Sequence, residues 1–135
     1  MSSCVGGQVR WTIGASPLDA RDVRREAVRW LTDAGVSKAD AADLVISEPL
    51  ANAVRSAHGA VSLEVSLIDG QVQIAVTDDG PGLFALPGAT LPPPEAEGSR
   101  GLFLVRQLSS DLEFAADPEG FTVRCWVPIY GDLVC

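Results

Sequence analysis

Three short segments of this 135-residue chain carry residue types that could do chemistry. Glu48 and Asn52 stand four residues apart in an Ala/Val/Leu/Ile-rich stretch, a spacing that places both on one face of a helix. Asp78, Gly80 and Gly82 directly follow an alternating apolar stretch and combine a carboxylate with an open backbone. A carboxylate, an amide oxygen and a glycine-rich turn are the groups that a nucleotide-phosphate site requires.

The first segment combines a metal-ligand type with a proton acceptor. The carboxamide oxygen of Asn52 suits Mg²⁺, which prefers oxygen ligands and shares them with substrate phosphates. Glu48, one turn earlier, could accept a proton from an attacking hydroxyl group or water. Their helical stripe begins apolar and becomes polar, and it comprises Ala41, Leu44, Val45, Glu48, Asn52 and Arg55. A solvated helix face with a polar end would show the same pattern.

Pro49 lies inside this expected helix. It removes one backbone hydrogen bond and disfavours helical geometry at Glu48, so the sequence predicts a kink there.

The third segment runs from Gly98 to Leu102 and stands at an expected helix start. Backbone N–H groups at a helix N-terminus attract anions, and Gly98 and Gly101 would let a phosphate come close. Arg100 could add a charge-assisted contact. Taken singly, this segment equally fits a glycine-containing helix start, and the second segment equally fits an ordinary Asp-Gly turn.

The elements that would position these segments follow from periodicity and turn residues. One helix is expected from a Ser16 N-cap to a stop at Gly35, and another from Ser37 towards Ala57. A proline-rich loop follows over 83–97, and a third helix is expected over about 100–109. Alternating apolar residues predict strands over 8–13, 61–67, 72–76, 112–115 and 121–128.

This order of elements predicts the fold class. Asp69-Gly70 is a type I′ turn signal and makes the second and third strands a hairpin. We expect one α/β (α+β) domain over residues 1–135, a two-layer sandwich of a mainly antiparallel mixed sheet with three helices on one face.

Composition excludes several classes of protein. The net charge of −8 and the pI near 4.4 argue against direct nucleic-acid binding, because an acidic surface repels phosphates. The apolar runs are too short for a membrane span, and no signal peptide is expected, so a cytoplasmic location is predicted. Cys4, Cys125 and Cys135 lack zinc-ligand spacing, which predicts free thiols.

Taken in order, E-x-x-x-N at Glu48, D-x-G-x-G at Asp78 and G-x-x-G-L at Gly98 resemble the N, G1 and G2 boxes of the Bergerat-fold (GHKL) ATPases. The chain is most similar to the branch of anti-sigma factor serine/threonine kinases, and the resemblance covers nearly its whole length. The resemblance implies ATP and Mg²⁺ as cofactors. It also implies a mobile lid over about 83–97.

The resemblance also implies roles for single residues. Asn52 would bind Mg²⁺, and Glu48 would be the general base of a kinase. Asp78 would read the adenine amine, with Gly80 and Gly82 shaping that pocket. Phosphate-binding residues would be Gly98, Arg100, Gly101 and Leu102.

The expected function is phosphorylation of a serine on a small antagonist protein, which controls the release of a bound sigma factor. An alternative is a catalytically silent module that binds ATP and changes its partner-binding surface; Pro49 favours it. Sigma factor and antagonist are the expected partners, a homodimer stays open, and neither nucleic acid nor membrane is expected.

Overall fold

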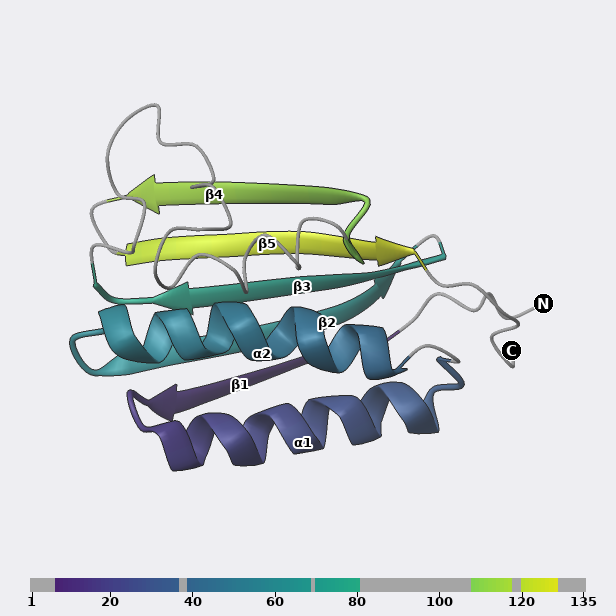
Figure 1. Cartoon of the computed structure of the whole chain (residues 1–135), viewed down its shortest axis with the longest axis horizontal. Helices are drawn as coiled ribbons and strands as arrows, with labels where there is room; N and C mark the ends of the chain where they lie inside the picture. The colour runs from purple at the N-terminus through teal and green to yellow at the C-terminus, as the bar shows by residue number, and fades with distance from the viewer. Residues whose placement is uncertain (1–6, 37–38, 69, 81–107, 118–119, 129–135) are drawn as a thin grey trace.

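Two helices cover one face of a five-stranded sheet and form a two-layer α+β structure (Figure 1). The computed structural model describes residues 7–36, 39–68, 70–80, 108–117 and 120–128. Within these residues the elements, in chain order, are β1 Gly7–Gly14, α1 Pro17–Asp33, α2 Ala39–Ser56, β2 Ala60–Ile68, β3 Gln71–Asp78, β4 Asp111–Asp117 and β5 Gly120–Pro128. The predicted fold class is confirmed, while the expected third helix and the loop over 83–97 fall outside the described residues.

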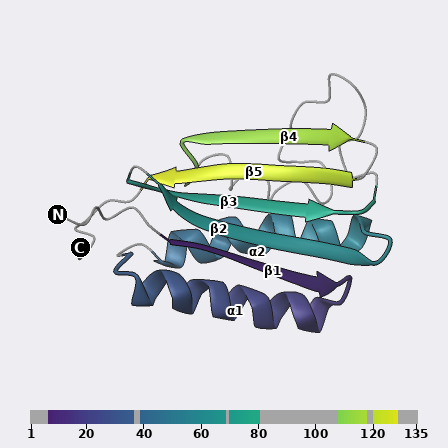
Figure 2. The ribbon, with the colours of Figure 1, turned by 180° about the vertical axis from the view of Figure 1, so that it is seen from behind.

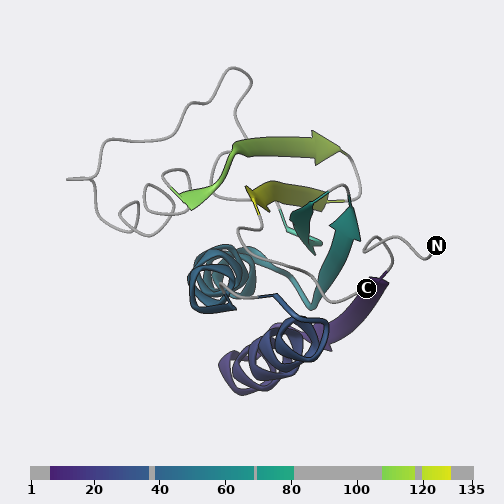
Figure 3. The same cartoon turned by 90° about the vertical axis from the view of Figure 1, so that its right-hand side faces the viewer.

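The sheet has the strand order β1-β2-β3-β5-β4, and every pair of neighbouring strands is antiparallel. The expected antiparallel character is therefore confirmed, although no parallel pair occurs among the described strands. Strand β3 is central, and β1 and β4 form the edges. Both helices lie on the same side of the sheet (Figure 3).

Local signals explain where the elements begin and end. Ser16 caps α1, since its hydroxyl oxygen accepts a hydrogen bond from the backbone N–H of Asp19 at 3.4 Å, and Pro17 occupies the first turn. Gly35 follows α1 with a φ of 92°, a left-handed conformation that favours glycine. Gly70 has a φ of 76° in the turn between β2 and β3, as the hairpin signal predicts.

The core lies between the helices and the sheet. The largest fully buried side chains of the helices are Leu31, Ile46 and Leu50, and those of the sheet include Leu63 and Ile74. Strand β5 alternates buried and half-buried residues, because successive side chains point to opposite faces, and β2 and β3 do the same except that Ser66 and Ala75 are also buried. One face of the sheet is therefore apolar and covered.

Two expectations from composition can be compared with the fold. Cys125 is a free, fully buried cysteine of β5, and burial raises the pKa of its thiol to about 12, which keeps it protonated and unreactive. Cys4 and Cys135 fall outside the described residues. None of the helices in the described part of the chain is long and apolar enough to cross a membrane.

Candidate functional site

Helix α2 carries the first candidate segment, and its buried stripe differs by one position from the predicted one. The buried apolar positions are Ala42, Val45, Ile46, Leu50 and Ala53, whereas Ala41 and Leu44 are only half-buried. The physical reason is that α2 packs over β3 as well as against α1, so a wider arc of the helix is covered.

The polar residues of the predicted stripe, Glu48, Asn52 and Arg55, lie in the second half of α2. Asn52 is only 7% exposed, Glu48 is half-buried and Arg55 is exposed. The helix continues through Pro49, whose ring is buried, and it is not broken beside Glu48. Glu48 therefore lies in helix α2, one turn before Asn52, as the spacing predicts.

The buried carboxamide of Asn52 already has a cationic partner. An Nη of Arg55 donates a hydrogen bond to Oδ1 of Asn52, the oxygen that the resemblance assigns to Mg²⁺. A buried amide oxygen needs such a donor, because leaving it unpaired costs about 1–3 kcal/mol. A metal ion at this oxygen would have to share it with the guanidinium or displace it.

Asp78 is the last residue of β3 and points to the helical side of the sheet. It is 4% exposed, and its Oδ1 accepts a hydrogen bond from the backbone N–H of Gly80 at 2.8 Å. Burial raises the pKa of this carboxyl group, while the Gly80 N–H acts in the opposite direction. A buried carboxylate of this kind gains free energy from a further donor, such as an amine.

Gly80 is needed for a close approach between two elements. A Cβ at this position would overlap the backbone carbonyl of Ser56, in the last turn of α2. Among the described glycines only Gly35 and Gly70 have positive φ, so Gly80 does not adopt the left-handed conformation. The absent side chain instead lets β3 end directly against α2.

Asp79, the second residue of the D-x-G-x-G segment, holds the connection between α2 and β2. Its Oδ1 accepts hydrogen bonds from the N–H groups of His58 and Gly59 at 2.7 and 3.0 Å, and its Oδ2 accepts one from Ala60 at 3.1 Å. The backbone hydrogen bond from Gly59, followed by those from Ala60 and His58, lowers the pKa of Asp79. These partners lie 19 to 21 positions before Asp79 in the sequence, so no local pattern could reveal this role.

Gly80 and Asp79 together place Asp78 next to the end of α2 that carries Asn52. His58, in the same connection, is exposed. Among the described residues no group of three His, Cys, Asp or Glu side chains could hold a metal ion. A cation at Asn52 would therefore depend on ligand oxygens for most of its coordination.

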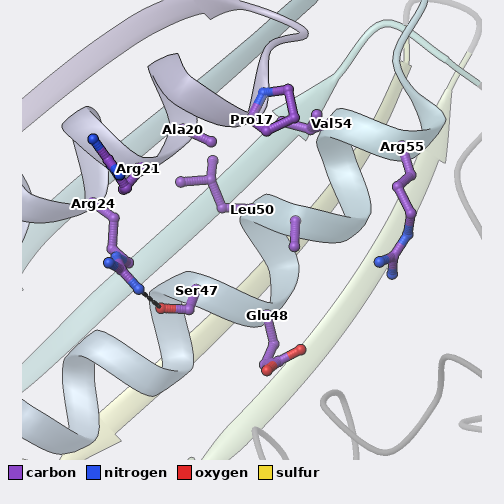
Figure 4. Close-up of a pocket in the computed structure, with 10 residues that line it drawn as sticks. Pro17, Ala20, Arg21, Arg24, Ser47, Glu48, Leu50, Val54 and Arg55 are labelled. Carbon is purple, nitrogen blue, oxygen red and sulfur yellow. Dashed lines mark hydrogen bonds between the residues drawn. The ribbon is translucent and has the colours of Figure 1, made fainter.

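A groove of about 500 Å³ lies between α1 and α2 on the outer side of the helical layer (Figure 4). Arg24 bridges the helices, with Nη1 at 3.4 Å from the Ser47 hydroxyl and Nε at 3.5 Å from Oδ1 of Asp43. Glu48 and Arg55 line the rim of this groove, but Figure 4 shows both side chains extending away from α1. The side chains of Glu48 and Arg55 thus extend away from α1, whereas Asp43 and Ser47 contact Arg24 of α1.

The remaining predicted site residues are not placed. Gly82, the lid over 83–97 and the residues Gly98, Arg100, Gly101 and Leu102 fall outside the described residues. Their roles stay predictions from the sequence.

The chain was compared with known families and structures. The family described as a histidine kinase-like ATPase domain matches residues 13–126. No curated protein matches the chain. In the crystal structure of the RsbU and RsbW domains of a Mycobacterium tuberculosis protein, the match has 21% identity and a TM-score of 0.66, and it covers 92% of this chain and 33% of that one. This likeness shows the fold alone.

Two histidine kinases have the same fold. The blue-light activated histidine kinase of Erythrobacter litoralis matches with 27% identity and a TM-score of 0.58, covering 81% of this chain and 40% of that one. A histidine kinase of Acinetobacter baumannii matches with 12% identity and a TM-score of 0.58, covering 91% and 68%. The chain thus spans a third and two fifths of the length of the first two structures.

The contact at Gly80 predicts a local effect on stability. Gly80→Ala should lower the free energy of unfolding by about 1–3 kcal/mol, because the added methyl group meets rigid backbone. Gly59→Ala is the matched control, since a Cβ there comes no closer than 3.8 Å to another group. Urea denaturation followed by circular dichroism measures both; equal losses would argue against the close approach.

The hydrogen bonds to Asp79 predict that the free energy of unfolding depends on pH. Because the folded-state pKa is below the ordinary 3.8, the ionised carboxylate stabilises the fold above about pH 4, and this contribution is lost as pH falls through the folded pKa. The difference in unfolding free energy between the wild type and Asp79→Asn should therefore be constant near neutral pH and shrink below about pH 4. Urea titrations from pH 7 down to about 2.5 measure it.

Asp22→Asn, at an exposed position of α1, is the control for the change in net charge. A difference for Asp79→Asn that does not change with pH would contradict the role given to this carboxylate.

Proposed function

This chain belongs to the histidine kinase-like ATPase domain family, and from that premise we propose that it binds ATP with Mg²⁺ and phosphorylates a serine on a small antagonist protein of a sigma factor. Membership in an ATPase domain family implies ATP as the nucleotide. The metal, the protein substrate and the sigma factor are the parts that we propose. The fold likeness to a structure containing an RsbW domain supports this branch of the family.

The observation that carries the proposal is the pair of buried polar side chains at the joined ends of α2 and β3. Asn52 and Asp78 are two of only three buried polar residues among those described, and both lie between the helical layer and the sheet. Buried polar groups are costly unless they are hydrogen-bonded, and each of these two accepts one hydrogen bond from the protein. A nucleotide bound at this end of α2 would give each of them a further hydrogen-bond or metal contact.

The donor set fits the two proposed ligands. Asn52 offers a neutral oxygen to the metal ion. The guanidinium of Arg55 beside it carries a positive charge that would attract phosphates. Bound Mg²⁺ would neutralise charge on the phosphates during transfer. Asp78 would accept a hydrogen bond from the adenine amine, and Gly98, Arg100, Gly101 and Leu102 would surround the phosphates.

Glu48 would receive the proton of the attacking serine hydroxyl as the oxygen–phosphorus bond forms. It is half-buried on the same side of α2 as Arg55, so it can face a phosphate held at Asn52 (Figure 4). Its carboxylate forms no hydrogen bond with another described residue, so it is available to accept a proton.

A catalytically silent, nucleotide-binding module is the second candidate function. Glu48 has no hydrogen-bond partner among the described residues, whereas a general base is commonly oriented by a further group, and this favours the silent module. Pro49, directly after Glu48, cannot donate a backbone hydrogen bond that would hold this turn in place.

Nucleotide binding can be tested at both buried residues. Asn52→Ala should abolish the Mg²⁺-dependent part of ATP binding, and Asp78→Asn should weaken ATP about 10- to 100-fold but GTP less, since it removes a charged acceptor for the adenine amine. Isothermal titration calorimetry with and without Mg²⁺ measures both, with Asp22→Asn as a surface control. Unchanged Mg²⁺-ATP binding by Asn52→Ala would contradict the role of Asn52 as a metal ligand. Equal losses of ATP and GTP affinity in Asp78→Asn would contradict the role of Asp78 in adenine recognition.

Phosphoryl transfer separates the two candidate functions. With labelled ATP and a candidate antagonist protein, the wild type should form phosphoserine, and Glu48→Gln should slow this by about 10²-fold or more while ATP affinity stays the same. The glutamine keeps the shape of the side chain but cannot accept the proton. Tight ATP binding with no transfer by the wild type would support the silent module.

A further inference from the structure

The exposed side chain of Arg55 reaches back to a buried amide on its own helix. Arg55 stands in the last turn of α2, where the negative end of the helix dipole favours a positive charge. It follows Asn52 by three positions, so the two side chains are neighbours on the helix surface. Figure 2 shows the face of the sheet that carries no described helix, and α2 lies behind the strands.

The contact uses the oxygen atom that the proposed metal ion would need. An Nη of Arg55 donates a hydrogen bond to Oδ1 of Asn52, a residue that is almost fully buried. Among the described residues Arg55 forms no ion pair, so a neutral amide rather than a carboxylate holds its guanidinium. A guanidinium has five N–H donors, and it can therefore bind a further acceptor without leaving Asn52.

A guanidinium and a metal ion at this oxygen exclude each other. Both are cations, and two cations held by one oxygen atom lie close enough to repel each other strongly in a partly buried site. The amide oxygen is neutral and carries no full negative charge that would offset this repulsion. Oδ1 of Asn52 therefore binds one cation at a time.

The charge of the chain makes a cation at this place necessary for binding a triphosphate. The net charge is −8, and such a surface repels a polyanion. Glu48 adds a carboxylate one turn before Asn52, and its side chain extends away from α1, as that of Arg55 does (Figure 4). Arg55 is the only basic residue in the sequence of α2.

We propose that Arg55 substitutes for the metal ion: in the absence of Mg²⁺ its guanidinium occupies Oδ1 of Asn52, and Mg²⁺ replaces it there. This inference rests on the proposed function, since it concerns the same ATP site. Without the metal, the guanidinium supplies positive charge, and its remaining N–H groups bind phosphate oxygens. When Mg²⁺ binds, the guanidinium leaves Oδ1 toward the solvent, to which Arg55 is already exposed.

This exchange differs from a simple phosphate contact in one measurable quantity. If guanidinium and Mg²⁺ act alternately, Arg55 contributes to ATP affinity mainly while the metal is absent. A side chain that only contacts phosphate contributes equally with and without the metal. The ratio of the ATP affinities with and without Mg²⁺ therefore separates the two roles.

Calorimetry of ATP binding with saturating Mg²⁺ and with EDTA tests the exchange. Arg55→Met removes the charge and the donors but keeps a long, unbranched side chain. It should weaken metal-free ATP binding about 10- to 100-fold, since charge-assisted hydrogen bonds are lost. It should change Mg²⁺-ATP affinity by less than about 3-fold, because the guanidinium has then already left Oδ1.

Arg21→Met, at an exposed position of α1, is the matched control, because it removes the same charge away from Asn52. It should leave both affinities near the wild-type values. Equal losses with and without Mg²⁺ in Arg55→Met, or an equal effect of Arg21→Met, would overturn the exchange while ATP binding stands. A wild type that binds ATP only with Mg²⁺ would do the same. A wild type that binds ATP under neither condition would overturn the proposed function, and the exchange with it.

The contact between Arg55 and Asn52 is measured without nucleotide. Arg55→Met should lower the urea midpoint of unfolding in the wild-type background and have a smaller effect in Asn52→Ala, where the acceptor is already removed. Circular dichroism follows the unfolding and also shows that each variant is folded before calorimetry. Equal shifts of the midpoint in both backgrounds would overturn the exchange, whatever the ATP affinities are.

Discussion

The close approach of β3 to the last turn of α2 is the constraint on which the rest of the structure depends. Gly80 permits it, since any side chain there would overlap the Ser56 carbonyl. Asp79 secures it by accepting three backbone hydrogen bonds from the connection that leads into β2. One glycine and one carboxylate thus determine how a helix end meets the centre of the sheet.

This contact explains why polar side chains can be retained between two apolar layers. Asn52 is satisfied by Arg55, and Asp78 by the N–H of Gly80, so neither is left without a partner. Burial nevertheless raises the pKa of Asp78, which shows that its surroundings still disfavour the charge. A fold optimised for stability alone would place apolar residues at these two positions.

The two faces of the sheet differ in the residues that they carry. The helical side buries the core together with Asn52 and Asp78, as its strands supply apolar residues at every second position. The open side carries rows of charges and hydroxyl groups whose positions follow from the same alternation.

The sequence by itself determined the strands, both described helices, the hairpin at Gly70 and the family, because these follow from periodicity, caps and motifs that are local in the chain. It also singled out Asn52 and Asp78 as candidate site residues. Only the tertiary structure decided which arc of α2 is buried, that Gly80 serves a backbone contact, that Asp79 holds residues twenty positions away, and how charges align across five strands. These features depend on which elements pack together, and that packing joins residues far apart in the sequence.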